Sequence, residues 1–184
     1  MAKYRHALAA LLAAVSVPAF GAVTVLGSTS ARLCFEAADS PLQPTIQDIR
    51  TCDRAFDENQ LTLYDTVATH VNRGILRLRH NRTDDARADF DRAIQLDPDQ
   101  PEAYLNKGAL LIRLNDPDGA LPLFTSALEH ETSRPALAHY GLAIAYEALG
   151  NVREAYSDYR RASELAPEWE EPRTELRRFT VVTR

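Results

Sequence analysis

Apolar and small residues recur along most of the chain at the spacing that places them on one face of an α-helix. Most Pro and Gly residues stand between these periodic stretches, where they would separate one helix from the next. Ala, Leu, Arg, Asp and Glu are abundant and β-branched residues are sparse, so we expect an all-α protein. The pattern predicts helix pairs at about 65–80 and 83–96, about 101–114 and 117–130, and about 134–149 and 152–165.

Small and aromatic residues return at a fixed interval within these pairs, 34 residues and then 35. A period of this size is typical of a repeat protein in which no single helix pair can bury its apolar face alone. Small residues on both helices of a pair would let the helices approach closely, with the aromatic residue filling the next gap. The equivalent residues are Gly74, Gly108 and Ala143; Ala86, Ala120 and Ala155; Phe90, Phe124 and Tyr159; and Ala93, Ala127 and Ala162.

These residues and their offsets resemble the tetratricopeptide repeat family over about residues 65–167. The sequence departs from the family pattern at Arg73 and Lys107, where apolar residues are commoner, and at Pro122 inside a helix. The resemblance implies a right-handed superhelical solenoid with three full repeats, a degenerate N-terminal hairpin and a C-terminal capping helix. We expect the boundaries to be 1–21 for a signal peptide, argued below, 22–64 for an extended start and the degenerate hairpin, 65–99, 100–135 and 136–169 for the repeats, and 170–184 for the capping helix.

The resemblance also implies a concave groove lined by the first helix of each repeat. Family members that bind extended peptides use an Asn that Asn72 and Asn106 match, 34 residues apart. An Asn amide offers both a donor and an acceptor, so it can hold a peptide group without reading its side chain. The alternative is that the two Asn residues only solvate the groove. The implied groove residues are Val71, Asn72, Ile75, Leu78, Arg79, Leu105, Asn106, Ala109, Ile112, Arg113, Tyr140, Ile144 and Glu147.

The chain contains two cysteines, Cys34 and Cys52. Residues 51–56 echo residues 89–94, which places Cys52 on the second helix of a degenerate repeat and Cys34 on the facing helix. In an exported chain this pair predicts a disulfide, which would stabilise by about 3 kcal/mol. The alternative is two buried thiols that only fill helix contacts.

Residues 1–6 carry two positive charges, and no charged residue follows from Ala7 to Ala31. This is the form of a secretory signal, and Ala19 and Gly21 would occupy the small positions that a signal peptidase reads. We expect cleavage after Gly21, with Ala22 or Ala31 as alternative sites, and a soluble protein in the bacterial periplasm or outside the cell. The other interpretation is an uncleaved N-terminal membrane anchor.

The formal net charge is −5, from 21 Lys and Arg against 26 Asp and Glu. That balance argues against nucleic acid as a ligand. The basic run from Arg77 to Arg82 is interpreted as a solvated helix end, because Asp84 and Asp85 follow it directly. We found no motif for a nucleophile, a phosphate loop, a metal or another cofactor, and His70 and His139 fit half-buried packing positions.

The sequence therefore predicts a non-enzymatic module that binds a protein or peptide partner in its groove, without a cofactor. The alternative is a structural subunit of a cell-envelope assembly that associates with itself through its terminal helices. Neither the partner nor the oligomeric state follows from the sequence.

Overall fold

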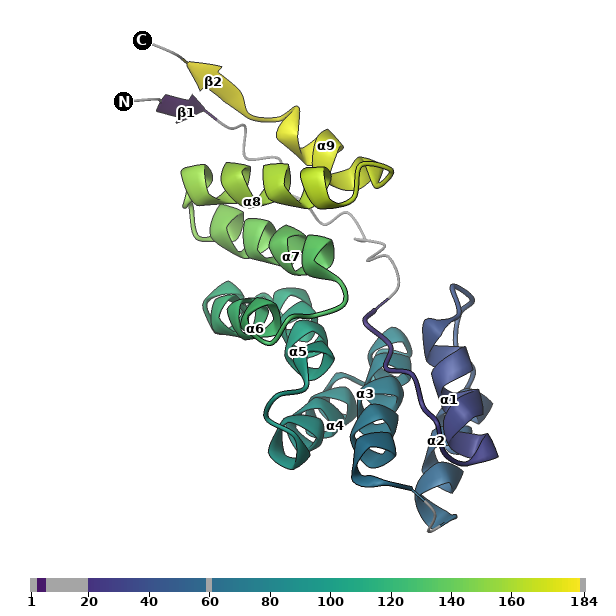
Figure 1. The fold of residues 1–184 in the computed structure, drawn as a ribbon. Helices are drawn as coiled ribbons and strands as arrows, with labels where there is room; N and C mark the ends of the chain where they lie inside the picture. The colour runs from purple at the N-terminus through teal and green to yellow at the C-terminus, as the bar shows by residue number, and fades with distance from the viewer. Residues whose placement is uncertain (1–2, 6–19, 59–60, 183–184) are drawn as a thin grey trace.

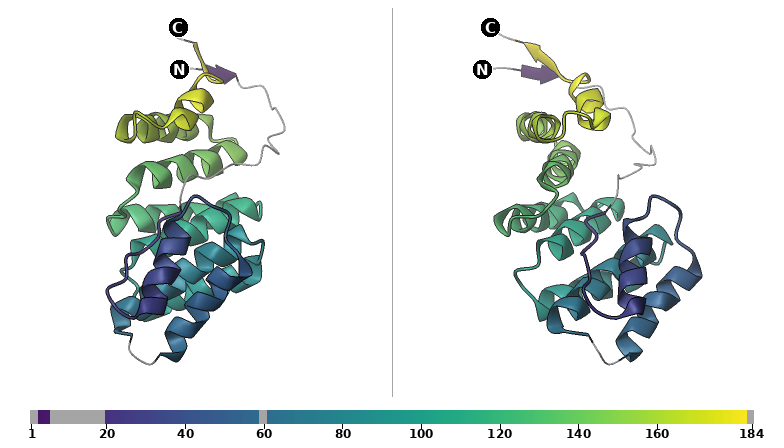
Figure 2. Two further views of the ribbon diagram at one scale, coloured as in Figure 1. Left: turned by 90° about the vertical axis from the view of Figure 1, so that its right-hand side faces the viewer. Right: turned by 45° about the vertical axis from the view of Figure 1, so that its right-hand side comes forward.

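The structure, a computed structural model, describes residues 3–5, 20–58 and 61–182. Within these residues nine helices follow one another and stack into an elongated molecule, with α1 and α2 at one end and α9 at the other (Figures 1 and 2). The helices are α1 (Thr29–Asp39), α2 (Ile46–Asp57), α3 (Leu63–Arg79), α4 (Thr83–Leu96), α5 (Pro101–Arg113), α6 (Pro117–Glu129), α7 (Pro135–Ala148), α8 (Val152–Leu165) and α9 (Glu170–Leu176).

Consecutive helices pair, so that α3 packs on α4, α5 on α6 and α7 on α8. Each pair also contacts the next one, because α4 touches α5 and α6 touches α7. The helices α1 and α2 form a further pair that covers α3. The predicted helical solenoid of three repeats with an N-terminal hairpin is therefore confirmed.

Helix starts and ends follow the local sequence. Proline stands at the first helical position of α5, α6 and α7, where its missing N–H is not needed. Asn81 and Asn115 adopt positive φ values just after α3 and α5, a conformation that Asn tolerates better than most residues. Thr45 and Asp48 form the predicted capping box at the start of α2.

Close helix approach depends on glycines that face aromatic rings. A Cβ atom at Gly74 would lie 2.5 Å from the Phe90 ring, and one at Gly141 would lie 2.4 Å from the Phe124 ring. A Cβ atom at Gly108, in the same repeat as Phe124, would lie 2.9 Å from that ring. The small residues on the first helices therefore face the aromatic residue of the second helix, and Phe124 is held between two repeats.

The C-terminal helix covers the last repeat with the help of two aromatic residues. Trp169 packs on Tyr140 with ring centroids 4.7 Å apart, and Phe179 packs on Tyr159 at 5.9 Å. The capping segment is less helical than expected, because α9 ends at Leu176. Beyond it the β-branched residues of β2 (Thr180–Val182) pair antiparallel with β1 (Lys3–Arg5), which belongs to the predicted signal peptide.

No helix in the described ranges is long and apolar enough to cross a membrane. Residues 6–19, which hold most of the predicted signal peptide, lie outside these ranges.

Candidate functional site

The first helices α3, α5 and α7 lie side by side and form what we call the first-helix surface. Residues 20–27, which we call the N-terminal segment, form neither a helix nor a strand and lie against the part of this surface formed by α3 and α5. In Figure 1 the segment is the dark purple stretch that runs beside α3 to the start of α1. The surface predicted to bind a peptide thus already holds a peptide segment of the same chain.

Asn72 holds the main chain of the N-terminal segment with both ends of its side-chain amide. Its Oδ1 atom accepts a hydrogen bond from the Val23 N–H at 2.9 Å, and its Nδ2 atom donates to the Val23 carbonyl at 2.7 Å. Asn72 is fully buried, so these bonds are shielded from water. The amide binds the N–H and the carbonyl of one residue, which belong to two successive peptide units, and makes no hydrogen bond to the Val23 side chain.

Asn106, one repeat further on, holds the segment with only one end of its amide. Its Nδ2 atom donates to the Gly21 carbonyl at 3.1 Å and to the Glu102 carbonyl of its own helix at 2.7 Å. Because both neighbours are acceptors, the nitrogen must occupy this position. The Oδ1 atom is buried and has no hydrogen-bond partner among the described residues.

Asp65 makes the third contact to the segment, two turns before Asn72 on the same face of α3. Its carboxylate accepts a hydrogen bond from the Leu26 N–H at 2.9 Å. The segment comes close to this side chain, because a Cβ atom at Gly27 would lie 2.8 Å from Asp65 Oδ2. At the other end, a Cβ atom at Gly21 would lie 3.0 Å from Glu102 Cγ. Two glycines therefore bracket the part of the segment that is bound.

From Val23 to Leu26 the side chains of the segment alternate between the first-helix surface and solvent. Val23 and Val25 are 7% and 5% exposed, whereas Leu26 is 86% exposed and Thr24 also faces water. Phe20 is buried as well and belongs to the same apolar cluster as the two valines. An alternation of this kind is the geometry of an extended chain with one buried face.

Comparison with known proteins identifies the repeat. The sequence profile of the tetratricopeptide repeat matches residues 71–129 and 110–168, which together span more than half of the chain. The chain belongs to the tetratricopeptide repeat family. No curated protein matches its sequence.

Solved structures of other tetratricopeptide repeat proteins share the fold. MamA from Desulfovibrio magneticus RS-1 is 22% identical with a TM-score of 0.60, over 71% of this chain and 71% of that chain. The first tetratricopeptide repeat domain of human RPAP3 is 25% identical with a TM-score of 0.57, over 61% and 87%. The first such domain of Spaghetti (RPAP3), bound to the HSP90 peptide SRMEEVD, is 24% identical with a TM-score of 0.58, over 61% and 88%.

The predicted groove residues fall into covered and open groups in this tetratricopeptide repeat structure. The residues on α3 and at the start of α5 are buried, because the N-terminal segment and α1 lie over them. The covered residues are Val71, Asn72, Ile75, Leu78, Leu105 and Asn106. Further along the surface, Ala109, Ile112 and Ile144 are only half-buried.

Other predicted groove residues bind neighbouring helices. Arg79 donates to the carbonyls of Ala38, Ser40 and Leu42, so it closes the end of α1. Arg113 does the same at the end of α3, through the Leu78 carbonyl and the Asn81 side chain. Burial lowers the pKa of Arg79 below its usual range, which does not discharge an arginine at neutral pH.

Tyr140 and Glu147 lie beneath the C-terminal cap. Glu147 accepts hydrogen bonds from Tyr159 at 2.9 Å and from Arg178 at 2.7 Å. Burial, together with the charge of Glu175, raises the pKa of Tyr140 to about 12. These contacts attach the cap to the third repeat, so they leave neither side chain free for a ligand.

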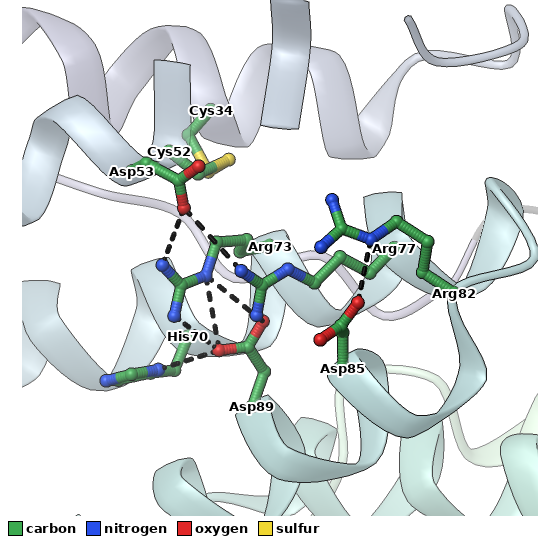
Figure 3. A network of polar contacts seen from close by, with 9 residues as sticks. All are labelled: Cys34, Cys52, Asp53, His70, Arg73, Arg77, Arg82, Asp85 and Asp89. Carbon is green, nitrogen blue, oxygen red and sulfur yellow. Dashed lines mark hydrogen bonds and ion pairs between the residues drawn. A yellow bond between two sulfur atoms is a disulfide. The ribbon is translucent and has the colours of Figure 1, made fainter. Parts of the chain in front are cut away.

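A buried ion cluster joins α2, α3 and α4 (Figure 3). Asp89 accepts hydrogen bonds from His70, Arg73 and Arg77 at 3.1, 2.7 and 2.7 Å, and Arg73 also reaches Asp53 at 2.7 Å. Burial alone would raise the pKa of Asp89, but the hydrogen bonds and the two positive charges bring it below its usual range. The cluster attaches the N-terminal hairpin to the first repeat, and the buried Arg77 Nε atom has no hydrogen-bond partner among the described residues.

The interpretation of Arg77 and Arg79 as a solvated helix end is therefore wrong. Arg77 is turned toward Asp89, with its side chain only 15% exposed, and Arg79 is turned toward α1. Sequence proximity to Asp84 and Asp85 suggested a solvated end, but α3 is covered by α1 and α2 there. Both arginines link α3 to a neighbouring helix or to its end.

The two cysteines lie on facing helices, as the degenerate repeat predicts. The Cys34 and Cys52 sulfur atoms are 2.05 Å apart, at disulfide distance, and they link α1 to α2. Cys52 directly precedes Asp53 of the ion cluster, which is visible in Figure 3. Among the described residues, no group of three or more His, Cys, Asp or Glu side chains is placed to hold a metal ion.

Two sides of this contact were not predicted from the sequence, namely Asp65 on α3 and the Val23 main chain of the segment. Asp65 could have been found, because it precedes Asn72 by seven residues and so shares its helix face. The Val23 main chain could not, because an extended segment has no repeat partner to align with.

Proposed function

We propose that the protein is an exported interaction module that binds an extended segment of a partner protein on its first-helix surface. The observation that carries the proposal is the paired hydrogen bonding of Asn72 to both main-chain groups of Val23. A side chain placed in this way recognises polypeptide as such, and neighbouring apolar contacts add the selectivity.

The fold supports this use of the surface. A protein of the same fold, the first tetratricopeptide repeat domain of Spaghetti, is bound to an HSP90 peptide. In the present chain the half-buried residues Ala109, Ile112 and Ile144 continue the surface beyond the N-terminal segment. A partner can contact this open part directly.

Export is supported by the composition of the N-terminus and by the cysteine pair. The basic lead and the uncharged stretch from Ala7 to Ala31 have the form of a secretory signal. The Cys34–Cys52 pair sits at disulfide distance, and disulfides persist mainly in oxidising compartments such as the periplasm. We therefore propose that the protein acts in the periplasm or outside a bacterial cell.

Site-specific photocrosslinking tests the binding surface. A photoreactive amino acid at Ile112 on the first-helix surface should crosslink a partner from the cell envelope, whereas one at the exposed Thr125 on α6 should not. Adding Asn106→Ala should reduce the Ile112 crosslink. Equal crosslinking from Ile112 and Thr125 would contradict the assignment of the surface.

Exposed apolar side chains on the N-terminal hairpin favour self-association as a second candidate function. Leu33, Leu42 and Ile46 are 43%, 75% and 44% exposed. An apolar outer face of this kind suits a contact between copies in an envelope assembly. Sedimentation velocity over a wide concentration range separates the two functions, because a monomer at all concentrations excludes self-assembly.

A further inference from the structure

We propose that the N-terminal segment, residues 20–27, is an intramolecular ligand that a partner must displace from the first-helix surface. We infer further that the displacing partner segment has the same chemistry: extended, uncharged, and with apolar side chains of valine size at alternate positions. This inference rests on the proposed function, because it concerns occupancy of the same surface.

The contacts of the segment define this ligand class. The hydrogen bonds that Asp65, Asn72 and Asn106 make to the segment all involve its main-chain atoms, so they select an extended chain and not a sequence. Selectivity comes from the buried alternate positions Val23 and Val25, where a charged side chain would lose its hydration without gaining a partner.

The main chain of the segment lies very close to the first-helix surface at two glycines, which further restricts the segments that could bind there. At Gly21 an added Cβ atom would lie 3.0 Å from Glu102 Cγ and 3.2 Å from Leu105 Cδ2. At Gly27 it would lie 2.8 Å from the Asp65 carboxylate. A competing segment therefore needs glycine, or another local main-chain path, at these two points.

The built-in occupant leaves one hydrogen-bonding group unused. Asn72 uses both ends of its amide, whereas the Asn106 Oδ1 atom is buried without a partner among the described residues. A buried acceptor without a donor is unfavourable. A partner segment that presents an N–H group to Asn106 would satisfy both amides, so it can compete with an occupant that satisfies only one of them fully.

Displacement would leave the rest of the N-terminal hairpin in place. The α1 helix begins at Thr29, separated from the end of the segment by one residue, and is held by the Cys34–Cys52 link and by Arg79 at its other end. The displaced segment therefore stays attached to α1 at its C-terminal end. This short connection gives it an effective concentration of about 1 mM at the first-helix surface. A free peptide must overcome this competition.

A synthetic peptide tests the competition. An acetylated, amidated and fluorescently labelled peptide with the sequence of residues 20–27, FGAVTVLG, is titrated with the full-length chain. In the Val23→Asp variant a charge at a buried position expels the tethered segment. We expect the peptide to bind this variant at least tenfold more tightly than the wild-type chain.

A matched control uses the neighbouring position. Thr24 faces solvent, so Thr24→Asp places the same charge one residue away and should bind the peptide as weakly as the wild-type chain. Asn72→Ala added to Val23→Asp should weaken peptide binding about tenfold. Equal binding to the wild-type and Val23→Asp chains would overturn the inference but leave the proposed function standing, because the surface would bind peptide without an internal competitor.

Two further outcomes overturn the inference. Folded Val23→Asp protein that binds no peptide would show that the segment lacks ligand chemistry, while partner crosslinking at Ile112 would still report on the proposed function. If the wild-type chain is a dimer and Val23→Asp dissociates it, the segment binds the surface of a second copy instead.

Amide hydrogen exchange tests the same contact without a variant. In the wild-type chain the Val23 N–H should exchange at least a hundredfold more slowly than the Thr24 N–H. Equal exchange rates would contradict binding of the segment within its own chain.

Discussion

Buried polar side chains in this protein have two different structural roles. Asn72 and Asp65 direct their hydrogen bonds to main-chain groups of another segment, so their partner can in principle be exchanged. Asp89 directs its bonds to His70, Arg73 and Arg77, which belong to the rigid part of the first repeat. The first kind can support binding, and the second kind fixes helices relative to one another.

Asp89→Asn should lower the free energy of unfolding by about 3 kcal/mol at pH 7, because it leaves two buried arginines short of one negative charge. Asp89 itself is only 2% exposed. Urea denaturation followed by circular dichroism measures the change. Asp91→Asn on the same helix is the matched control, since the Asp91–Lys107 pair is partly exposed, and should cost about 0.5 kcal/mol. Equal losses in the two variants would contradict the role of the buried cluster.

The pH dependence of stability should report on the same residue. The pKa of Asp89 is lowered in the folded state, so its unfolded form binds protons more readily. Its contribution is therefore fully present above the unfolded pKa of about 3.9 and is lost as the pH falls through the lower folded pKa. The stability difference between the wild-type and Asp89→Asn chains should shrink across this window.

At the scale of the helix and the hairpin, the sequence predicts the contacts that recur in each repeat and does not predict the contacts that occur only once. The 34-residue spacing of Gly74 and Gly108 located the repeats, because each glycine meets an equivalent Phe. The partners of Arg79 were not predictable, since they are main-chain carbonyls at the end of α1. The binding place of residues 20–27 was missed for a similar reason, although the alternating Val23 and Val25 indicate a one-sided extended chain.

The link between α1 and α2 should be worth about 3 kcal/mol of folding free energy, as expected for a crosslink that closes a loop of this size. Cys34 and Cys52 are 18 residues apart in sequence. Dithiothreitol should lower the urea midpoint of the wild-type chain and leave that of the Cys34→Ala, Cys52→Ala double variant unchanged. If the reductant has no effect on the wild-type chain, and unreduced protein is labelled at both thiols, the two cysteines are not bonded.

At the scale of the whole molecule, the N-terminus connects distant parts of the stack. Residues 20–27 cross from α5 to the start of α3, so they contact two repeats at once. The β1 strand pairs with β2 beyond the C-terminal cap at the other end of the molecule (Figure 1). Removal of a signal peptide would therefore take away the β1 strand at the C-terminal end and the Gly21 contact on α5 in the middle of the stack.

We expect the protein purified from its own envelope to begin at Ala22, because Ala19 and Gly21 are small enough for the signal peptidase site. Cleavage there keeps the contacts of Val23 with Asn72 and of Leu26 with Asp65, but it removes the Gly21 carbonyl that Asn106 binds. Intact-mass spectrometry and N-terminal sequencing identify the first residue. A chain that still begins at Met1 would favour the membrane anchor.

Such processing would leave the first-helix surface half occupied. The α3 part would stay covered by residues 22–27, while Asn106 would lose its contact with Gly21 and become available to a partner segment. The free peptide of residues 20–27 should then crosslink more strongly at Ile112 in the processed chain than in the full-length chain. Equal crosslinking in both forms would mean that Phe20 and Gly21 do not limit access to the surface.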